Sequence, residues 1–457
     1  MQTIVAIATG VVNSGISIVR VSGDKAIEIS NKCLPKLSLS DVQERSMHLT
    51  ELDFGDVKDK GLVVKFVAPK SFTGEDVVEF HLHGSYALAQ LAVEKLIEYG
   101  ASLATPGEFS KRAFLNGKMS LEEAEGVIDL INSESKAQLN ASYNLIVGKL
   151  KEAIDVMQSK LTDILAEVEV SIDYPEEDIE YTTKENVKSC LQEVRGGLQK
   201  LIDNSKVGEK IKTGVTACII GKPNVGKSSL LNAMLNYEKA IVTDIEGTTR
   251  DVIEGVYEYK GVRFNLVDTA GIRHCADTVE KIGIDKAKSM LSQCDVVMCM
   301  LDGSSSLTEQ DIEVIDLIKK YNDKQVVILI NKSDALTFDN ATIQTKLKEN
   351  KIQQAKIINI SAKNKHNIDE LKEYLYSISF DAGIDCSALY ISNTRQIECL
   401  KNALVSINQA LNALQSASID CISLDIKNAW NELAKITGKL VTEQVVDAIF
   451  SKFCLGK

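Results

Sequence analysis

The segment Gly221–Ser228, GKPNVGKS, matches the pattern G-x-x-x-x-G-K-[ST] at every fixed position. It follows a short apolar run, Val215–Ile220, that predicts a buried strand, and precedes a run, Ser229–Leu235, that predicts a helix. Such a loop wraps a phosphate chain with backbone N–H groups at a helix N-terminus. We expect Lys227 to contact β- and γ-phosphates and Ser228 to bind Mg²⁺. A chance turn containing Gly and Lys is the alternative, and the flanking elements disfavour it.

Four further motifs follow this loop in order. They are Gly247–Asp251 (GTTRD), Asp268–Gly271 (DTAG), Asn331–Asp334 (NKSD) and Ser361–Lys363 (SAK). The last three stand at the ends of predicted strands, and the first supplies Thr249 as a second hydroxyl for Mg²⁺. Five motifs in this order predict a nucleotide-binding α/β domain.

The identity of the base follows from Asp334. A carboxylate only accepts hydrogen bonds, and guanine offers two donors on one edge, N1–H and N2–H₂. Adenine lacks that pair and would leave the carboxylate unmatched. Asp268 is placed to reach Mg²⁺ through water, and the Gly271 N–H to sense a γ-phosphate. The motifs therefore predict a guanine-nucleotide site.

Hydrolysis needs a group that orients water and a charge that stabilises the transferring phosphoryl group. Ras-like GTPases place Gln directly after the DxxG glycine, but this chain has Ile272 there. The catalytic group must therefore come from elsewhere. Glu280 is one option and a monovalent cation near Asn224 is another; Arg250 is either an arginine finger or a surface residue.

Length and composition set the broad class. The 457 residues suggest about three domains. The net charge of −12 excludes a uniformly basic nucleic-acid surface, so RNA contacts must come from a local patch or a partner. Ten scattered cysteines without a C-x-x-C pair favour a reducing compartment. Neither an 18-residue apolar run nor a leader sequence is evident, so we expect a cytoplasmic protein without membrane spans.

Apolar periodicity divides the chain into three predicted domains. Residues 1–117 predict an α+β domain, and residues 213–378 an α/β domain with a largely parallel sheet. Residues 118–210 and 380–457 carry helical stripes, which predict one helical domain, discontinuous in sequence, into which the α/β domain is inserted. The predicted strands are 3–8, 15–21, 65–67, 77–82, 215–220, 263–267, 296–301, 326–330 and 356–360, and a helix is predicted for 87–99.

Two histidines, His81 and His83, alternate along a predicted strand and share one of its faces. They could bind a metal, but no third ligand is evident, so an ordinary polar strand face is the favoured interpretation.

The motifs and their order resemble the tRNA-modification GTPase family called MnmE or TrmE, over essentially the whole chain. The N-terminal resemblance lies in TIVAIAT, IVRVSG, SFTGEDVVEFHLHG and PGEFSKRAFLNGKMSL. VTDIEGTTRDV, DTAGIR and VEKIGI resemble the family's switch regions, and FCLGK its C-terminal signature. The resemblance implies a Ras-like P-loop GTPase domain inserted in a helical domain, with an N-terminal folate-binding and dimerisation domain.

The motifs and the resemblance together predict the nucleotide site. It comprises Asn224, Val225, Gly226, Lys227, Ser228, Ser229, Thr243, Asp244, Ile245, Glu246, Gly247, Thr248, Thr249, Asp268, Thr269, Ala270, Gly271, Asn331, Lys332, Ser333, Asp334, Ser361, Ala362 and Lys363. The resemblance also implies a K⁺ ion held by Asn224, Thr243, Ile245 and Thr248 between the G domains of a homodimer. Glu280 would then position the attacking water.

For the N-terminal domain, the resemblance implies a tetrahydrofolate one-carbon donor, in the 5-formyl or 5,10-methylene form. Arg20, Glu79, Lys118 and Lys457 would contact it, and Cys454 would lie beside the one-carbon unit. With an FAD-containing partner, in an expected heterotetramer, the complex would add an aminomethyl or carboxymethylaminomethyl group to C5 of the wobble uridine of certain tRNAs.

Rival interpretations differ in how much of the chain they use. A GTPase switch for ribosome or RNA assembly needs only the G motifs and leaves residues 1–116 and FCLGK without a role. A membrane-remodelling GTPase is disfavoured by the acidic charge and the absence of a basic amphipathic face. Cys454 is fourth from the end, but Gly456 and Lys457 do not fit a prenylation box. An ordinary buried thiol is the remaining alternative for Cys454.

Overall fold

A computed structural model describes residues 2–173, 179–235, 255–268, 290–321, 324–335, 355–380, 383–385, 387–416 and 422–457. The chain divides into two compact units. The first comprises residues 1–131, 142–199 and 398–457, and the second comprises residues 132–141 and 200–397. The finer division into three domains stays a prediction.

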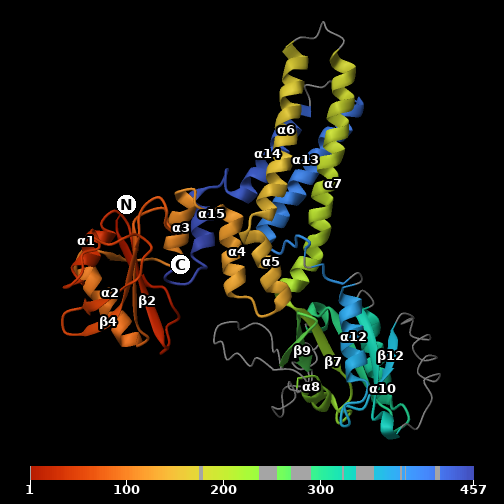
Figure 1. Cartoon of the computed structure of the whole chain (residues 1–457). Helices are drawn as coiled ribbons and strands as arrows, with labels where there is room; N and C mark the ends of the chain where they lie inside the picture. The colour runs from red at the N-terminus through yellow and green to blue at the C-terminus, as the bar shows by residue number, and fades with distance from the viewer. Residues whose placement is uncertain are drawn as a thin grey trace. The chain divides into compact units, whose positions relative to one another are not determined.

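A mixed six-stranded sheet forms the N-terminal part of the first unit (Figure 1). Its strand order is β3-β4-β5-β2-β1-β6; the β1–β6 pair is parallel and the other pairs are antiparallel. The strands are β1 (Ile4–Ile7), β2 (Ile16–Ser22), β3 (His48–Asp53), β4 (Lys58–Phe66), β5 (Val77–His83) and β6 (Ser102–Leu103), and the helices are α1 (Ala26–Asn31), α2 (Tyr86–Glu98) and α3 (Glu108–Leu115).

Strand alternation decides which side chains of this sheet enter the core. Val19 and Val21 of β2 and Phe80 of β5 are fully buried. The intervening Arg20 and Glu79 lie on the other face, directly opposite each other in the β2–β5 register. The hydrophobic core therefore leaves a polar pair on the outer face.

The predictions for this sheet were accurate where apolar residues alternate regularly. Strands β2 and β5 and helix α2 begin and end within one residue of their predicted bounds. Strand β3 was missed, and β4 is much longer than predicted. Both carry many charged residues, so the apolar pattern of each strand is weak.

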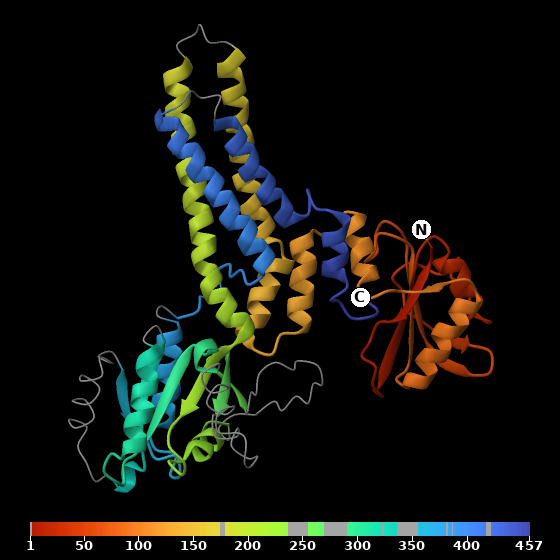
Figure 2. The same cartoon turned by 180° about the vertical axis from the view of Figure 1, so that it is seen from behind.

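Long helices form the rest of the first unit. Buried Leu161 and Val168 of α6 and Leu400 and Ile407 of α13 follow the helical stripes that the sequence predicted. Helices α6 and α14 lie side by side in both views (Figure 1, Figure 2). The helices are α4 (Leu121–Ile131), α5 (Lys136–Ile146), α6 (Lys149–Asp173), α7 (Ile179–Thr213), α13 (Thr394–Ser416), α14 (Ser423–Thr437) and α15 (Glu443–Phe450), of which α5, α7 and α13 contribute residues to both units.

The second unit is built on a largely parallel sheet, as predicted. The strand order is β12-β11-β10-β7-β9-β8, and only β8 runs antiparallel to its neighbour. The strands are β7 (Val215–Ile220), β8 (Gly255–Tyr259), β9 (Val262–Asp268), β10 (Val296–Asp302), β11 (Gln325–Asn331) and β12 (Lys356–Asn359), and the helices include α8 (Lys227–Leu235), α10 (Glu309–Ile318) and α12 (Ile368–Ser379). Strand β8 was not predicted.

Strands β7, β10 and β11 are almost fully buried apolar segments, which is characteristic of a parallel sheet covered on both faces. Their carboxyl ends place the glycine loop and the NKSD segment at one edge of the sheet. Among the described helices, none is sufficiently long and apolar to cross a membrane.

Candidate functional site

The glycine loop connects the end of β7 to the start of α8, as the sequence predicted. Gly226 has a φ of 105°, and a Cβ there would lie 2.4 Å from Nδ2 of Asn331. Only glycine fits that position without displacing Asn331. Asn224, Ser228 and Ser229 are exposed on the loop and the first turn of α8. These polar side chains are therefore available to a ligand.

Lys227 lies across the inside of this loop. Its ammonium group donates hydrogen bonds to the carbonyls of Gly221 and Lys222 at 2.8 and 2.9 Å, and the residue is only 7% exposed. The loop carbonyls hold the positive charge beside the N-terminus of α8, where the helix dipole also favours an anion. This arrangement suits the phosphate chain of a nucleotide.

Asp268 lies at the same edge of the sheet as the glycine loop. It is the last residue of β9, is 1% exposed, and lies opposite Ile219 in the parallel β7–β9 pair. The register therefore brings this carboxylate next to the start of the glycine loop, as predicted from the ends of parallel strands.

Asn331, at the end of β11, joins the NKSD and SAK segments to the glycine loop. Its side-chain amide donates to the Val225 carbonyl at 2.8 Å, and its side-chain oxygen accepts from the Ala362 N–H at 2.9 Å. The side chain is almost fully buried. The NKSD, SAK and glycine-loop segments therefore form one connected site.

Asp334 lies at the exposed side of this arrangement. The Ser361 hydroxyl donates to its Oδ1 at 2.7 Å. That hydrogen bond, followed by backbone hydrogen bonding and the positive charge of Lys363, lowers the pKa of the Asp334 carboxyl. The group is therefore held as a pure acceptor, which is the state that guanine recognition requires.

Two contacts of the nucleotide site have no counterpart in the sequence motifs. Lys332 pairs with Asp302, the last residue of β10, at 2.6 Å. Lys222 donates to Asp311 of α10 at 2.7 Å, and Asp311 is 2% exposed. The position of Asp302 at a strand end could have indicated the first contact, whereas nothing in the local sequence marks the second.

Several predicted residues lie outside the described residues. They are Thr243, Asp244, Ile245, Glu246, Gly247, Thr248, Thr249, Thr269, Ala270, Gly271 and Glu280, together with Arg250 and Ile272. Their roles stay predictions.

A second polar site surrounds Arg20 in the first unit. Its Nε donates to Glu79 Oε1 at 2.8 Å, and the two side chains are 18% and 15% exposed. The guanidinium also lies over the rings of Phe72 and Phe109, 5.4 and 5.7 Å from their centroids. Arg20 is therefore held by a carboxylate and two aromatic rings while it stays within reach of solvent.

The C-terminal tail, residues 454–457, reaches the same site. The Phe109 N–H donates to the Lys457 carbonyl at 3.2 Å, and the Gly107 N–H donates to the Cys454 carbonyl at 3.4 Å. A Cβ at Gly456, where φ is 93°, would lie 2.1 Å from the Ile7 carbonyl oxygen. The tail is therefore closely packed against β1 and the start of α3, and both views show the C-terminus near α3 (Figure 1, Figure 2).

The two ends of the tail differ in their surroundings. Partial burial, and then the positive charge of Arg20, lower the pKa of Lys457. Cys454 is exposed, which contradicts the interpretation of this residue as an ordinary buried thiol. Lys118 is also exposed, with its stem beside Gly74 in the 71–76 loop. All four predicted folate contacts and Cys454 are thus in the first unit, and Arg20, Glu79 and Lys457 are close together.

The histidine pair is divided between two carboxylates. His83 Nδ1 lies 2.6 Å from Asp59, and His81 Nε2 lies 3.5 Å from Glu79. The described part of the chain contains no group of three potential metal-binding side chains.

Comparisons with known proteins cover the entire chain. Residues 3–118 match the model of the GTP-binding protein TrmE N-terminus, and residues 121–454 match that of the MnmE helical domain. The tRNA modification GTPase MnmE of Clostridioides difficile is 40% identical over 100% of this chain and 99% of the relative. The chain belongs to the MnmE family. The Alkaliphilus oremlandii protein of the same name is 39% identical, again over 100% of this chain and 99% of that protein.

Membership of the MnmE family confirms the predicted resemblance and fold class. It also accounts for the joint presence of the N-terminal sheet, the long helices and the parallel sheet in one chain. Part of the chain is also similar to a solved Era variant of Aquifex aeolicus bound to GDP·AlF4−, with 27% identity, 42% of this chain and 66% of that chain covered, and a TM-score of 0.30.

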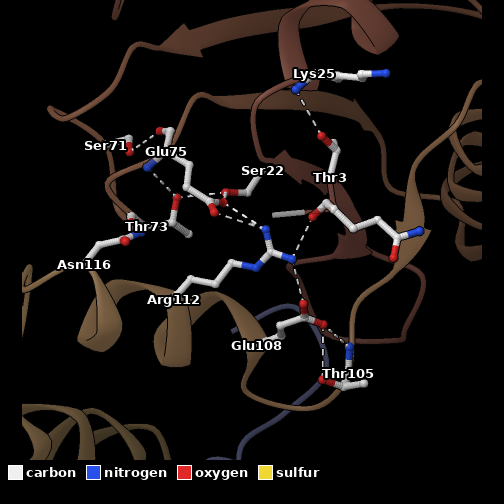
Figure 3. Close-up of polar contacts among 11 residues, drawn as sticks. Thr3, Ser22, Lys25, Ser71, Thr73, Glu75, Thr105, Glu108, Arg112 and Asn116 are labelled. Carbon is white, nitrogen blue, oxygen red and sulfur yellow. Dashed lines mark hydrogen bonds and ion pairs between the residues drawn. The ribbon is translucent and has the colours of Figure 1, made fainter.

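One feature of this MnmE-family chain was not predicted at all. Arg112 of α3 is 5% exposed and contacts two carboxylates, Glu75 and Glu108 (Figure 3). These residues lie in two stretches that carry the family resemblance, SFTGEDVVEFHLHG and PGEFSKRAFLNGK. The resemblance did not predict an ionic contact between the two stretches. Sequence separation explains only the Glu75 contact, which spans 37 positions, because Glu108 and Arg112 have the i,i+4 spacing of an ordinary helical ion pair.

Proposed function

We propose that this chain hydrolyses GTP and, with an FAD-containing partner, adds an aminomethyl or carboxymethylaminomethyl group to C5 of the wobble uridine of certain tRNAs. The observation that carries the proposal is the presence, in one MnmE-family chain, of the connected Val225–Asn331–Asp334 site and the separate Arg20–Lys457 site. Relatives that align over the full chain are named tRNA modification GTPases. A pure assembly switch would use only the first site and would give the closely packed C-terminal tail no role.

The first site suits GTP and Mg²⁺. The fit rests on Lys227, whose buried ammonium group faces the loop, and on the exposed hydroxyl of Ser228. Ser228 and Thr249 would hold Mg²⁺, which would supply positive charge to the phosphates. Asp334 selects guanine by accepting from N1–H and N2–H₂, and Lys227 binds the phosphate oxygens.

Hydrolysis requires a group that Ile272 cannot supply. We propose that Glu280 orients the attacking water, and that Asn224, Thr243, Ile245 and Thr248 hold K⁺, which would supply the charge of an arginine finger. Asn224 supports this assignment because it is exposed on the loop, with a left-handed φ of 62°. The G domains of a homodimer would pair across the cation.

The second site suits a tetrahydrofolate derivative, in the 5-formyl or 5,10-methylene form. Arg20 and Lys457 bring two positive charges close together, and the repulsion between them favours an anionic ligand such as the folate glutamate. Glu79 and Lys118 complete the proposed contacts, and the bound folate would supply the one-carbon unit. Cys454 lies at this end of the chain with an exposed thiol.

The proposed activity requires assembly with a second copy of the chain and with a partner protein. A homodimer would bind the FAD-containing partner to form a heterotetramer that acts on tRNA in the cytoplasm. The composition supports a reducing compartment, since the ten cysteines include no C-x-x-C pair.

GTP turnover in K⁺ compared with Na⁺ tests the hydrolysis mechanism. We expect K⁺ to accelerate turnover by about tenfold or more, because its charge would replace that of an arginine finger. Glu280→Ala should keep GTP affinity and lose turnover. Equal rates in both salts would exclude the cation, and an active Glu280→Ala variant would exclude Glu280 as the water-orienting residue.

A further inference from the structure

Arg112 of α3 belongs to neither of the two proposed sites. Its Nη1 lies 3.2 and 3.0 Å from the two carboxylate oxygens of Glu75. Its Nη2 donates to Glu108 Oε1 at 2.7 Å and to the Gln2 carbonyl at 2.8 Å. One guanidinium group therefore joins the 71–76 loop, the start of α3 and the N-terminal segment (Figure 3).

The contact between Arg112 and Glu108 leads to the C-terminal tail. The second oxygen of Glu108 accepts from the backbone N–H and the hydroxyl of Thr105 at 2.9 and 3.1 Å, which fixes the turn from 105 to 108. The next N–H groups, those of Gly107 and Phe109, donate to the carbonyls of Cys454 and Lys457. The conformation of this turn therefore decides where the tail binds.

The contact between Arg112 and Glu75 leads to the aromatic rings that lie over Arg20. Ser22 donates to Glu75 Oε2 at 2.8 Å, and Asn116 donates to the Thr73 carbonyl at 2.7 Å. These bonds fix the 71–76 loop, which carries Phe72. The second ring over Arg20 belongs to Phe109 of α3, the helix that carries Arg112.

Arg112 joins these two sets of contacts directly, through one guanidinium group. Its side chain is 6% exposed, and those of Glu75 and Glu108 are 10% and 21% exposed. Burial opposes ionisation of Glu108, but hydrogen bonds from Thr105 and Arg112 outweigh it and lower the pKa of that carboxyl. The planar fork of arginine can bind two carboxylates at once, and a lysine ammonium cannot reproduce that geometry.

We propose that Arg112 is a positioning residue that sets the affinity for the one-carbon donor by holding both the C-terminal tail and the 71–76 loop in place beside Arg20. The proposal rests on the proposed function, because it takes the Arg20–Lys457 site to be the donor site. Arg112 does not touch the donor; it acts through Glu108 on Lys457 and through Glu75 on Phe72.

The test compares Glu108→Gln, Arg112→Lys and Lys111→Gln in the full-length chain. Glu108→Gln replaces one of the two acceptor oxygens with a donor NH2, so the side chain can no longer accept from both Arg112 and the Thr105 N–H, and the Glu75 contact stays intact. Arg112→Lys keeps the charge and loses the fork. Lys111→Gln is the matched control, since it removes a positive charge from the adjacent position of α3, where Lys111 pairs with Asp447 on the surface.

Two measurements are made on each variant. Amide hydrogen exchange at Gly107 and Phe109 reports release of the tail without any ligand, and titration with 5-formyltetrahydrofolate reports donor affinity. We expect Glu108→Gln and Arg112→Lys to raise exchange at both amides, and to weaken the ligand, by about tenfold. Exchange in the buried strands β2 and β5 should stay unchanged, which a general loss of folding would not allow.

The outcomes separate this inference from the function on which it rests. If the unmodified chain does not bind 5-formyltetrahydrofolate, the donor site itself is wrong. If it binds but Glu108→Gln and Arg112→Lys bind equally well, the positioning role of Arg112 is wrong and the donor site stands. An equal effect of Lys111→Gln would also overturn the role, because any loss of charge from α3 would then suffice.

Discussion

The side-chain amide of Asn331 donates a hydrogen bond to the backbone carbonyl of Val225 over 2.8 Å. This bond connects the NKSD segment, proposed to recognise the base, to the glycine loop, proposed to hold the phosphates. The same side chain accepts from the Ala362 N–H, so three motifs distant in sequence share one buried residue. The NKSD, SAK and glycine-loop segments are therefore structurally coupled in this chain.

Asn331→Ala should weaken GDP binding. The substitution leaves the buried Val225 carbonyl and Ala362 N–H without their partner, at a cost of about 1–3 kcal/mol for each unsatisfied group. We expect affinity for a fluorescent GDP analogue to fall by about tenfold or more. Gln325→Ala, at the exposed opposite end of β11, is the control and should bind normally. Unchanged affinity in Asn331→Ala would show that the bond is not needed.

Asp334→Asn should change the preferred base. An amide offers a donor where the carboxylate offers only acceptors, so it mismatches guanine and matches xanthine, which has a carbonyl at C2. We expect GTP affinity to fall by about a hundredfold and XTP affinity to rise. Competitive nucleotide titration measures both, and a variant that still prefers GTP would contradict the assignment of Asp334.

Lys222→Met should destabilise the glycine loop, because Lys222 belongs to that loop and pairs with Asp311. It leaves Asp311 as a buried carboxylate without its cationic partner, and breaking a buried pair in this way costs about 3–5 kcal/mol. The double variant Lys222→Met, Asp311→Asn should recover much of that loss, because it removes the unpaired charge and keeps an acceptor for Thr308. Thermal unfolding in the presence and absence of GDP compares them. If the double variant is no more stable than Lys222→Met alone, the ion pair is not the cause.

Glu122 of α4 should make the stability of the folded chain fall as the pH rises. The residue is fully buried, and within the described residues neither carboxylate oxygen makes a hydrogen bond of standard geometry. Burial raises the pKa of this carboxyl from 4.5 to about 7. The folded state therefore binds an additional proton between these values, so the contribution to stability is present below pH 4.5 and lost as the pH rises to about 7.

Glu122→Gln should remove this pH dependence. The shift corresponds to about 3 kcal/mol, so the variant should be more stable than the unmodified chain at pH 8 and similar to it at pH 4.5. Urea unfolding at several pH values measures the difference, with the exposed Glu152→Gln as control. A variant that follows the pH profile of the unmodified chain would contradict the buried-acid assignment.

Sequence patterns predicted the elements that carry these residues better than the contacts between them. Gly226, Lys227 and Asp334 were assigned correctly to their elements, because a glycine loop and strand ends are local features. The bond from Asn331 to Val225 spans 106 positions and depends on the order of strands in the sheet, which no local motif specifies. The contacts of Arg112 with Glu75 and Gln2 were missed for the same reason, since these partners are 37 and 110 positions away.

The strands show the same limit. The alternating core of β2 and β5 was predicted within one residue because one face is apolar. Strand β3, HLTELD, has only Thr50 and Leu52 buried, so its apolar pattern is too weak to predict a strand. Its extended conformation follows from its pairing with β4.

The most direct measurement of the central claim is the formation of modified wobble uridine in a reconstituted reaction. The unmodified chain, its FAD-containing partner, unmodified tRNA, a tetrahydrofolate one-carbon donor and an amine source are incubated in K⁺ with GTP, and the nucleosides are identified by mass spectrometry. We expect a 5-aminomethyl or 5-carboxymethylaminomethyl uridine that disappears with Lys227→Ala, with GDP in place of GTP, or without the folate donor. Equal modification in the Lys227→Ala reaction, or in the reaction without folate, would contradict the claim.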